Sequence, residues 1–345
     1  MKNYLLIAAA GLFGLAACHS LEPAAGIPDE GSIILSVQGS DGPLTKANAN
    51  VNPIGNEAAI DSIQTFLFSS DGSLYRRICL RNNQFTESLS RVKTGIYSIV
   101  AVANAPALTT ITNRSELEST AINLGMNDTQ GGFLMFGADT VEVIAGTSAV
   151  QSTVTVSRYV GRVRLVSVKN NLPAAYGSLS VDYAFLENAY GRWTYGTQGV
   201  PDTYVNLRGR TKSSETVLIT ESSLAEYPAL TFKSLAQNVA AGATGAVNAP
   251  FYTLPNRHAA GSDNFTATTS GEHCARLVVH VSYGNQGWYY PVTIGNLERN
   301  KTYDVSFSIS GPGVSDPDQP VTTGSLSVTV NVDTWKSGGV IEGEF

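Results

Sequence analysis

The chain has 345 residues, of which 43% are hydrophobic and only 14% are charged. This length exceeds that of a single small domain and predicts about two domains, each large enough for its own core. The 22 basic and 28 acidic residues give a formal charge of −6. With so few basic residues the sequence offers no surface that could neutralise a phosphate backbone, so we expect no nucleic-acid partner.

The first residues have the pattern of an export signal. Lys2 precedes an apolar run from Tyr4 to Leu15, which is shorter than the roughly 20 residues of a membrane-spanning helix. We therefore expect a signal peptide at residues 1–17 and no membrane-spanning segment elsewhere. Leu15-Ala16-Ala17-Cys18 resembles the lipobox of bacterial lipoproteins, which implies that Cys18 is lipidated. The alternative is an ordinary signal peptide followed by an unrelated cysteine.

Hydrophobic residues alternate with a period of two along much of the following chain, as they do in strands with one buried face. After a tether at residues 19–30, Ile33, Leu35 and Val37 share one face of a first strand, and Asp71-Gly72 marks a hairpin. The other elements expected in the first half are strands at 60–68, 74–80, 95–103, 140–144 and 152–156, and a helical turn at 115–120.

A run from Val156 to Val168 near the middle of the chain predicts one long strand. Its arginines, Arg158, Arg162 and Arg164, are expected on a solvated face. The elements expected in the second half are strands at 276–283, 288–294, 302–309 and 326–332, and a helical turn at 222–227. Regularly spaced strands on both sides of a boundary near residue 160 predict an all-β fold of two β-sandwich domains in tandem, with minor helices.

The sequence contains no recognisable catalytic pattern. The four histidines, which are His19, His258, His273 and His280, lack the spacing of a zinc protease, and phosphate-binding and nucleophile motifs are absent. Cys79 and Cys274 are expected to be unpaired thiols buried in strands, with a disulfide in an oxidising periplasm as the alternative. We therefore expect no enzyme activity, no cofactor and no metal.

Two further stretches have a functional and a structural interpretation. Asp316-Pro317-Asp318 has ligand atoms for calcium, but acids beside proline are usually solvated turn residues. Trp288-Tyr289-Tyr290 could stack against a sugar, yet Trp288 and Tyr290 share one face of a strand and are expected in the core. The structural interpretation is preferred for both.

Four separated stretches resemble one family, the fimbrillins, which are lipoprotein precursors of the type V pili of oral and gut anaerobes. They are, in chain order, the lipobox; Pro43-Leu44-Thr45-Lys46-Ala47; the stretch from Ser157 to Leu165; and Leu297 to Asp304, which leads to Gly311-Pro312-Gly313. Residues 325–335 are similar to the closing strand of the family and its tryptophan. The resemblance covers essentially the whole chain and looks closest to the major, shaft-forming subunit.

This resemblance implies tandem sandwiches of the transthyretin-like or immunoglobulin-like Greek-key type and assembly by strand exchange. The lipidated precursor would reach the outer membrane, where a Lys/Arg-directed protease cuts the loop after the first strand. Loss of that strand opens a hydrophobic groove, which the carboxy-terminal segment of a neighbouring subunit fills. The expected parts are a signal peptide at 1–17, a lipidated propeptide at 18–46, an amino-terminal domain at 47–160 and a carboxy-terminal domain at 161–345.

Lys46 is the expected cleavage point. It is the first basic residue after Lys2 and lies in a long, turn-rich stretch, where a protease can reach the backbone. Cleavage between Lys46 and Ala47 would remove the lipid together with the strand that contains Ile33, Leu35 and Val37. The best-known members of the family have Arg at this point, and an Arg-only protease would not use Lys46. The alternative is that Lys46 is simply a solvated loop charge.

The expected donor segment lies at the carboxy terminus. It would complete a sheet edge through its backbone while alternate side chains enter pockets. Two sets of apolar residues qualify and both stay open: Leu326, Val328, Val330 and Val332 on one face of a strand, and Val340, Ile341 and Phe345 in the tail beyond Gly338-Gly339.

The leading hypothesis is a non-enzymatic pilin of a cell-surface fimbrium that serves adhesion and colonisation. Its partners would be copies of itself, other fimbrial subunits, the maturation protease, the membrane through the lipid before cleavage, and a host or bacterial ligand that the sequence does not identify. One alternative is a tip or anchor subunit; an anchor would keep its lipid. The other is a surface lipoprotein that binds glycans through Trp288, Tyr289 or nearby aromatic residues.

Overall fold

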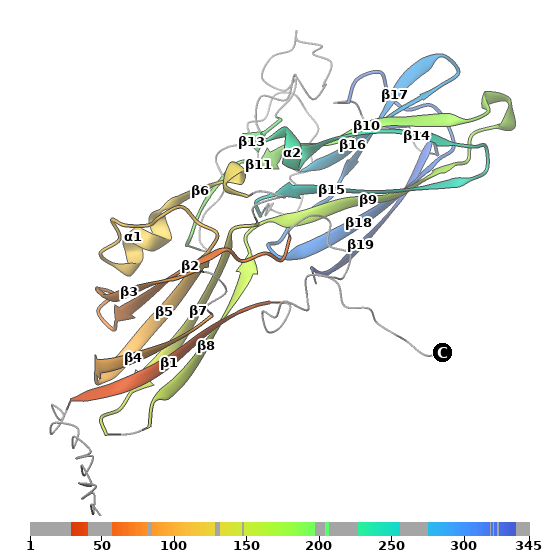
Figure 1. Cartoon of the computed structure of the whole chain (residues 1–345). Coiled ribbons are helices and arrows are strands. Elements are labelled where there is room, and N and C mark those ends of the chain that lie inside the picture. The colour runs from red at the N-terminus through yellow and green to blue at the C-terminus, as the bar shows by residue number, and fades with distance from the viewer. Residues whose placement is uncertain are drawn as a thin grey trace, which may run out of the picture.

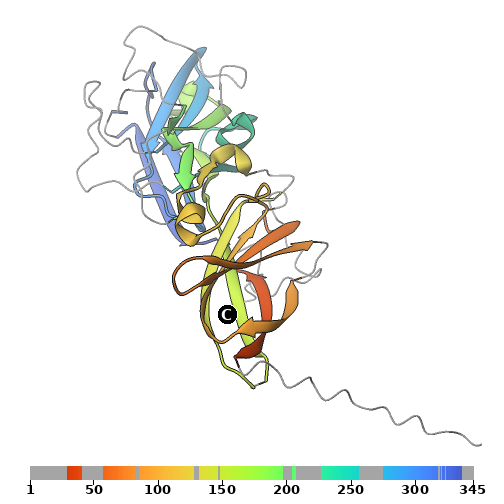
Figure 2. The same cartoon turned by 90° about the vertical axis from the view of Figure 1, so that its left-hand side faces the viewer.

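The structure is a computed structural model that describes residues 29–40, 57–81, 85–127, 132–146, 148–196, 204–206, 227–255, 275–317, 319, 321–322 and 324–335. It is elongated, with one group of sheets at each end (Figures 1 and 2). None of the helices in this part of the chain is long and apolar enough to cross a membrane. Several predicted sites lie outside the described residues, namely Cys18, Lys46, Ala47, Val340, Ile341 and Phe345.

The first half of the chain forms one seven-stranded sheet with the order β3-β2-β5-β7-β8-β1-β4. The strands are β1 (Glu30–Gly39), β2 (Ser62–Ser69), β3 (Leu74–Arg81), β4 (Thr86–Lys93), β5 (Gly95–Ala103), β7 (Met135–Val143) and β8 (Val150–Arg158). β7 and β8 pair only at Met135 and Phe136, so the sheet opens there into two facing layers, with an apolar core between them. This is the amino-terminal sandwich.

The second half forms two four-stranded sheets, β14-β10-β16-β17 and β15-β9-β18-β19, which enclose a second apolar core. The strands are β9 (Gly161–Asn170), β10 (Leu179–Glu187), β14 (Phe232–Val239), β15 (Thr244–Thr253), β16 (Arg276–Tyr283), β17 (Gln286–Thr293), β18 (Lys301–Ile309) and β19 (Leu326–Thr334). The predicted all-β fold with tandem β-sandwiches is therefore confirmed. The division into domains at residues 47–160 and 161–345 stays a prediction.

The two sandwiches are joined by more than the chain between them. β6 (Ala121–Asn123) from the first half pairs with β12 (Arg192–Thr194) from the second, and α1 (Arg114–Ser119) precedes β6. The remaining short elements are β11 (Ala189–Tyr190), β13 (Tyr204–Val205), α2 (Pro228–Thr231) and the single 3₁₀ turns η2 (Leu124–Met126) and η3 (Ala174–Tyr176). One continuous apolar cluster runs from Phe66 in β2 to Trp335 beyond β19, so apolar burial opposes any movement of one sandwich against the other.

The structure corrects three expectations. The run from Val156 to Val168 is not one strand, because β8 ends at Arg158 and β9 begins at Gly161 in a different sheet. Arg158 and Arg162 are not solvated; they are 1% and 7% exposed, since buried acceptors and an indole ring surround them. Cys79 is a free thiol but is exposed, because it lies on the face of β3 opposite to that of the buried Leu80.

The second expected helical turn is only partly accessible to comparison. Residues 222–226 lie outside the described part of the chain, and the helix α2 begins at Pro228, one residue beyond the expected range. The first expected turn, at 115–120, corresponds to α1. Its start is fixed by Asn113, whose side-chain oxygen accepts a hydrogen bond of 2.9 Å from the Glu116 N–H.

Candidate assembly site

The first strand, β1, lies inside the sheet of the amino-terminal sandwich rather than at its edge (Figure 1). It pairs in parallel with β8, from Ile33 opposite Val150 to Gly39 opposite Val156. On its other side it pairs antiparallel with β4, with a bulge between Gly31 and Ile33. Both backbone edges of β1 are thus hydrogen-bonded, and taking it away leaves β8 and β4 each with an unpaired edge.

The three aliphatic side chains that the sequence places on one face of β1 point into the core. Ile33 and Leu35 are fully buried and Val37 is 3% exposed. They belong to one cluster with side chains from β8, β4 and the opposite layer, among them Val154, Leu89 and Ile99. Without β1, these neighbours would line an apolar slot one strand wide.

β1 also fits its site closely at its beginning. A Cβ atom added to Gly31 would lie 2.8 Å from the backbone oxygen of Ile144 and 2.8 Å from Cγ1 of Val143. Glycine is therefore required by space at this position, where the strand bulges.

The last strand, β19, has the opposite position in its sheet. It is the edge strand beside β18 and pairs with it antiparallel, from Leu326 opposite Ile309 to Thr334 opposite Lys301 (Figure 1). Its other backbone edge has no strand partner among the described residues. Such an edge is a template for pairing with another chain.

The aliphatic face of β19 is only partly covered. Leu326 and Val328 are half-buried against the carboxy-terminal core. Val330 is 37% and Val332 58% exposed, and they are among the few large hydrophobic residues exposed in the described part of the chain. β19 is thus held on its own subunit mainly by the backbone ladder to β18.

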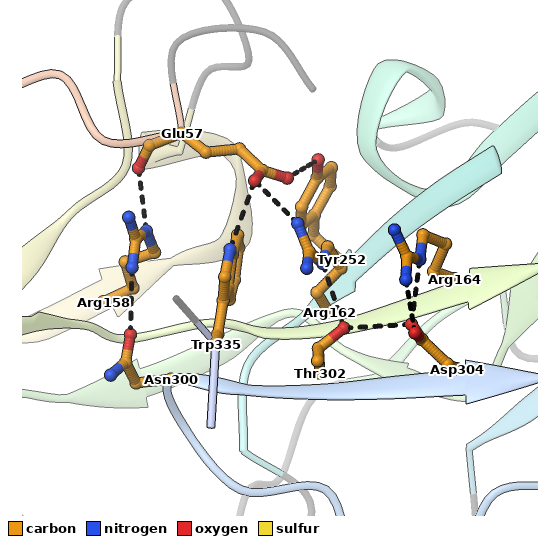
Figure 3. Close-up of polar contacts among 9 residues, drawn as sticks. All are labelled: Glu57, Arg158, Arg162, Arg164, Tyr252, Asn300, Thr302, Asp304 and Trp335. Carbon is orange, nitrogen blue, oxygen red and sulfur yellow. Dashed lines mark hydrogen bonds and ion pairs between the residues drawn. The ribbon is translucent and has the colours of Figure 1, made fainter. Parts of the chain in front are cut away.

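A buried polar cluster lies where the two sandwiches meet (Figure 3). We call it the junction cluster; its members are Glu57, Arg158, Arg162, Tyr252, Asn300, Thr302 and Trp335. Glu57 is the first described residue after the segment that contains Lys46, and its side chain is only 2% exposed. One side chain therefore ties the end of that segment to the body of the protein.

Glu57 is bonded by residues from far along the chain. Its carboxylate accepts 2.7 Å and 2.6 Å hydrogen bonds, from Nη1 of Arg162 and from the Tyr252 hydroxyl. Its backbone oxygen accepts a 2.7 Å bond from Nε of Arg158. Burial, and then the nearby Glu57 carboxylate, raise the pKa of Tyr252, so this hydroxyl remains a donor. The buried negative charge of Glu57 is thus compensated by the guanidinium of Arg162 and by a hydroxyl donor.

Trp335 completes the cluster from the end of β19. It is fully buried, and its indole Nε1 donates a 3.1 Å hydrogen bond to Oε2 of Glu57. The guanidinium carbons of Arg158 and Arg162 lie 4.7 Å and 4.8 Å from the centre of its ring, within cation–π distance. Tyr252 stacks on the ring at 5.7 Å.

Asn300 connects this cluster to β1. Its backbone oxygen accepts a 3.0 Å bond from the Trp335 N–H, and its Oδ1 accepts 3.1 Å from Nη1 of Arg158. Its Nδ2 donates a 3.2 Å bond to Oγ of Ser40, directly after β1. The two residues that flank segment 41–56, Ser40 and Glu57, are thus held at the same junction.

The neighbouring Arg299 makes the same junction rigid. Its Nη2 donates to the backbone oxygens of Phe136 at 3.0 Å and Ser157 at 2.8 Å, and its guanidinium lies 4.4 Å from the Tyr159 ring centre. Burial lowers the pKa of Arg299. The stretches Ser157–Leu165 and Leu297–Asp304, whose sequences carried the family resemblance, therefore meet in space at this junction.

The other predicted sites form no reactive constellation within the part of the chain that the structure describes. Tyr290 is fully buried and Tyr289 is 7% exposed, so neither ring offers an open face to a sugar, and Trp288 packs partly against the core. His280 lies on β16 and is hydrogen-bonded to Asp182 at 2.9 Å. Within the described ranges no three His, Cys, Asp or Glu side chains are grouped so as to hold a metal ion. His273 and Cys274 lie outside them.

Sequence reasoning missed Glu57 and the role of Trp335 as its partner. Glu57 is an isolated acid in a polar loop, and its bonds to Arg162 and Trp335 span 105 and 278 positions of sequence. The available signal was the row of three arginines at 158–164 in a chain with so few charges. Such a row, which the structure divides between β8 and β9, alternates with core residues and calls for a buried acid.

Comparison with known proteins agrees with this architecture. The family described as fimbrillin-A associated anchor proteins Mfa1 and Mfa2 matches residues 30–337. None of the curated proteins matches the sequence. A candidate cell adhesion protein of Bacteroides eggerthii is similar in structure, with a TM-score of 0.62 and 18% identity over 89% of this chain and 96% of that one.

Two fimbrial proteins of Porphyromonas gingivalis share the fold as well. The fimbrilin FimA has a TM-score of 0.62 and 15% identity, over 89% of this chain and 98% of that one. The tip protein Mfa3, solved with a carboxy-terminal truncation, has a TM-score of 0.54 and 12% identity, over 89% of this chain and 100% of that one. Because the family match spans nearly the whole described chain, this protein belongs to the family of the fimbrillin-A associated anchor proteins Mfa1 and Mfa2.

Proposed function

We propose that this protein is a structural subunit of a cell-surface fimbrium that polymerises by strand exchange after proteolysis. The observation that carries the proposal is the position of β1, a strand paired on both sides with its aliphatic face buried, followed by a segment that contains the first Lys or Arg of the exported chain. A cut between Lys46 and Ala47 breaks the covalent link between β1 and the rest of the subunit. The new amino-terminal segment would still be held at Glu57 by its bonds to Arg158, Arg162 and Tyr252.

Removal of β1 would create the acceptor. Burial of a large aliphatic side chain contributes about 1.5–3 kcal/mol, so insertion of new aliphatic side chains where Ile33, Leu35 and Val37 had been would be strongly favourable. The exposed backbone edges of β8 and β4 add directional hydrogen bonding. A strand with aliphatic residues at every second position satisfies both.

The donor would be the carboxy-terminal segment of the next subunit. Leu326, Val328, Val330 and Val332 repeat the spacing of the β1 side chains, and two of them are exposed in the isolated subunit. Full burial of four such side chains contributes on the order of 6–12 kcal/mol before the cost of ordering. Val340, Ile341 and Phe345 would extend the contact.

The proposed route to the surface follows from the amino terminus. Lipidation at Cys18 would hold the precursor at the outer membrane, and removal of residues 18–46 by a Lys/Arg-directed protease would release residues 47–345 into the growing fimbrium. Other fimbrial subunits and an adhesion ligand would be its further partners. No catalytic role is proposed.

The test is maturation in vitro. The precursor without its signal peptide is treated with a trypsin-like protease, the new amino terminus is sequenced, and polymers are followed by size-exclusion chromatography and electron microscopy. We expect Ala47 as the new first residue and polymers that resist dilution. Lys46→Gln should stay monomeric, whereas Lys169→Gln, an exposed lysine on β9, should assemble like the wild type. Polymers from Lys46→Gln would refute the proposed cut.

A second candidate function is that of an anchor subunit, because the matching family is described by its anchor proteins. An anchor would keep Cys18, its lipid and β1, and would contribute only its donor segment to the neighbouring subunit. The amino terminus of the protein in isolated fimbriae separates the two functions: Ala47 means a subunit of the shaft, and lipid-modified Cys18 means an anchor.

A further inference from the structure

β19 is attached to its own subunit very unevenly along its length. Its side chains from Val330 to Thr334 are exposed, and its outer backbone edge pairs with no strand of the described ranges. The next residue, Trp335, is fully buried in the junction cluster. Most of the side-chain contact that retains this end of the strand is thus concentrated in one residue at its very end.

The contacts of Trp335 come from both sandwiches. Phe133 of the first half meets its ring edge-on at 5.6 Å, and Tyr252 of the second half stacks on it. The arginines on either side of the inter-sandwich connection both face the ring, and Glu57 accepts from its N–H. The pocket for the indole therefore exists only while the two sandwiches and Glu57 are in place.

We infer that Trp335 is an intramolecular catch that keeps β19 on its own subunit, and that its withdrawal from the junction cluster precedes donation of β19 to a second copy of this chain. This inference rests on the proposed function. A strand that pairs at one edge and leaves Val330 and Val332 in water has aliphatic burial to gain in the vacant site of β1. The catch opposes that transfer until an acceptor is present.

The same contacts predict the order in which β19 is released. As long as the indole is buried, the backbone N–H of Trp335 is bonded to the backbone oxygen of Asn300 and β19 stays in register with β18. Once the indole leaves, the outermost residues of β19 are held by backbone bonds of an edge strand alone, which open readily by fraying. Release would start at Thr334 and run toward Leu326.

Hydrogen exchange of the uncut precursor tests the catch without assembly. In Trp335→Ala we expect amides of β19 and of the β18 positions paired with it to exchange at least tenfold faster, while amides of β1 and β8 change less than twofold. Trp335→Phe retains a ring between the two guanidinium groups but loses the N–H, so its effect should be intermediate. Phe185→Ala, a buried aromatic of β10 in the other sheet, serves as the control and should leave β19 unchanged.

Assembly kinetics test the consequence. After removal of β1 by protease, Trp335→Ala should polymerise several-fold faster than the wild type. A disulfide between cysteines at Ser306 and Thr329, which lie opposite each other in β18 and β19, should stop polymerisation of both proteins until it is reduced. Cys18, Cys79 and Cys274 are replaced by Ser in these chains, so that no other thiol interferes.

Each outcome bears on the inference. If the protein with the disulfide between positions 306 and 329 polymerises without reduction, β19 does not leave and the inference is wrong. The tail beyond Trp335 would then be the sole donor. If Trp335→Ala speeds exchange throughout both sandwiches and polymerises no faster, Trp335 is only a core residue, which also overturns it. If the wild type itself forms no polymers after loss of β1, the proposed function fails, while the exchange pattern still shows whether Trp335 retains β19.

Discussion

β1 and β19 carry nearly the same sequence pattern and occupy opposite situations. Both have aliphatic residues at every second position, and both are nine or ten residues long. β1 is paired on both edges with its aliphatic face buried, whereas β19 is paired on one edge with half of that face in water. The pattern determines which face of a strand is apolar; the place of the strand in its sheet determines whether that face is covered.

In the proposed strand exchange, this difference would set the direction. The side chains of β1 are already buried, so we expect β1 to leave only after the chain that follows it is cut. Val330 and Val332 of β19 have burial still to gain, whereas Leu326 and Val328 would exchange the core of their own subunit for that of the acceptor. In the proposed exchange, a subunit that gives up β1 and receives the β19 of a neighbour would end with a filled core, and the burial of Val330 and Val332 would add to the stability of the joint.

The largest expected effect separates the two strands in the uncut monomer. Leu35→Ala removes a fully buried side chain of β1 and should lower the free energy of unfolding by about 2–5 kcal/mol. Val332→Ala, at a position 58% exposed in β19, should change it by no more than about 0.5 kcal/mol. Urea denaturation followed by circular dichroism measures both.

Equal losses in the two variants would break the comparison, because they would mean that β19 is as much a part of the folded core as β1. The slope of the transition should be unaltered in both proteins, as expected when only the stability of the folded state changes.

The next effect concerns the assembled state. Val332→Ser leaves the fold of the monomer intact but removes one side chain that the acceptor site would bury, so the joint between subunits should weaken by about 1.5–3 kcal/mol. Dissociation of polymers in increasing denaturant measures this. Thr329→Ser on the opposite face of β19 is the matched control and should have little effect; a loss as large as that of Val332→Ser would place the wrong face of β19 in the acceptor.

The strands with regular aliphatic alternation could be predicted from the sequence, β5 and β16 even to their bounds. β4 could not, because Thr86–Lys93 is mostly polar and charged, and only Leu89 and Val92 reach the core. Period-two reasoning detects a strand by its buried face, and a strand at the edge of a sheet offers few residues to detect.

The junction cluster was beyond sequence reasoning for a different reason. Its residues come from five separate stretches of the chain, and only two stretches contribute two members each, Arg158 with Arg162 and Asn300 with Thr302. Arg158 and Arg162 looked like surface charges, since charged residues are rarely buried. What reverses that expectation is Glu57 together with the Trp335 ring, and only the tertiary fold brings these together.

The smallest expected effect concerns the turn that leads into β19. Gly324 has φ of +93° and open space around its Cβ position, so Gly324→Ala should cost about 1 kcal/mol of stability through backbone strain alone. Gly72 in the hairpin before β3 has a similar angle, +84°, and equally open space, so Gly72→Ala should cost about the same. Hydrogen exchange distinguishes them: only Gly324→Ala should speed exchange in the Leu326 half of β19. If it does, β19 is retained at its start by the turn and at its end by Trp335; if exchange there is unchanged, the pairing with β18 holds that half by itself.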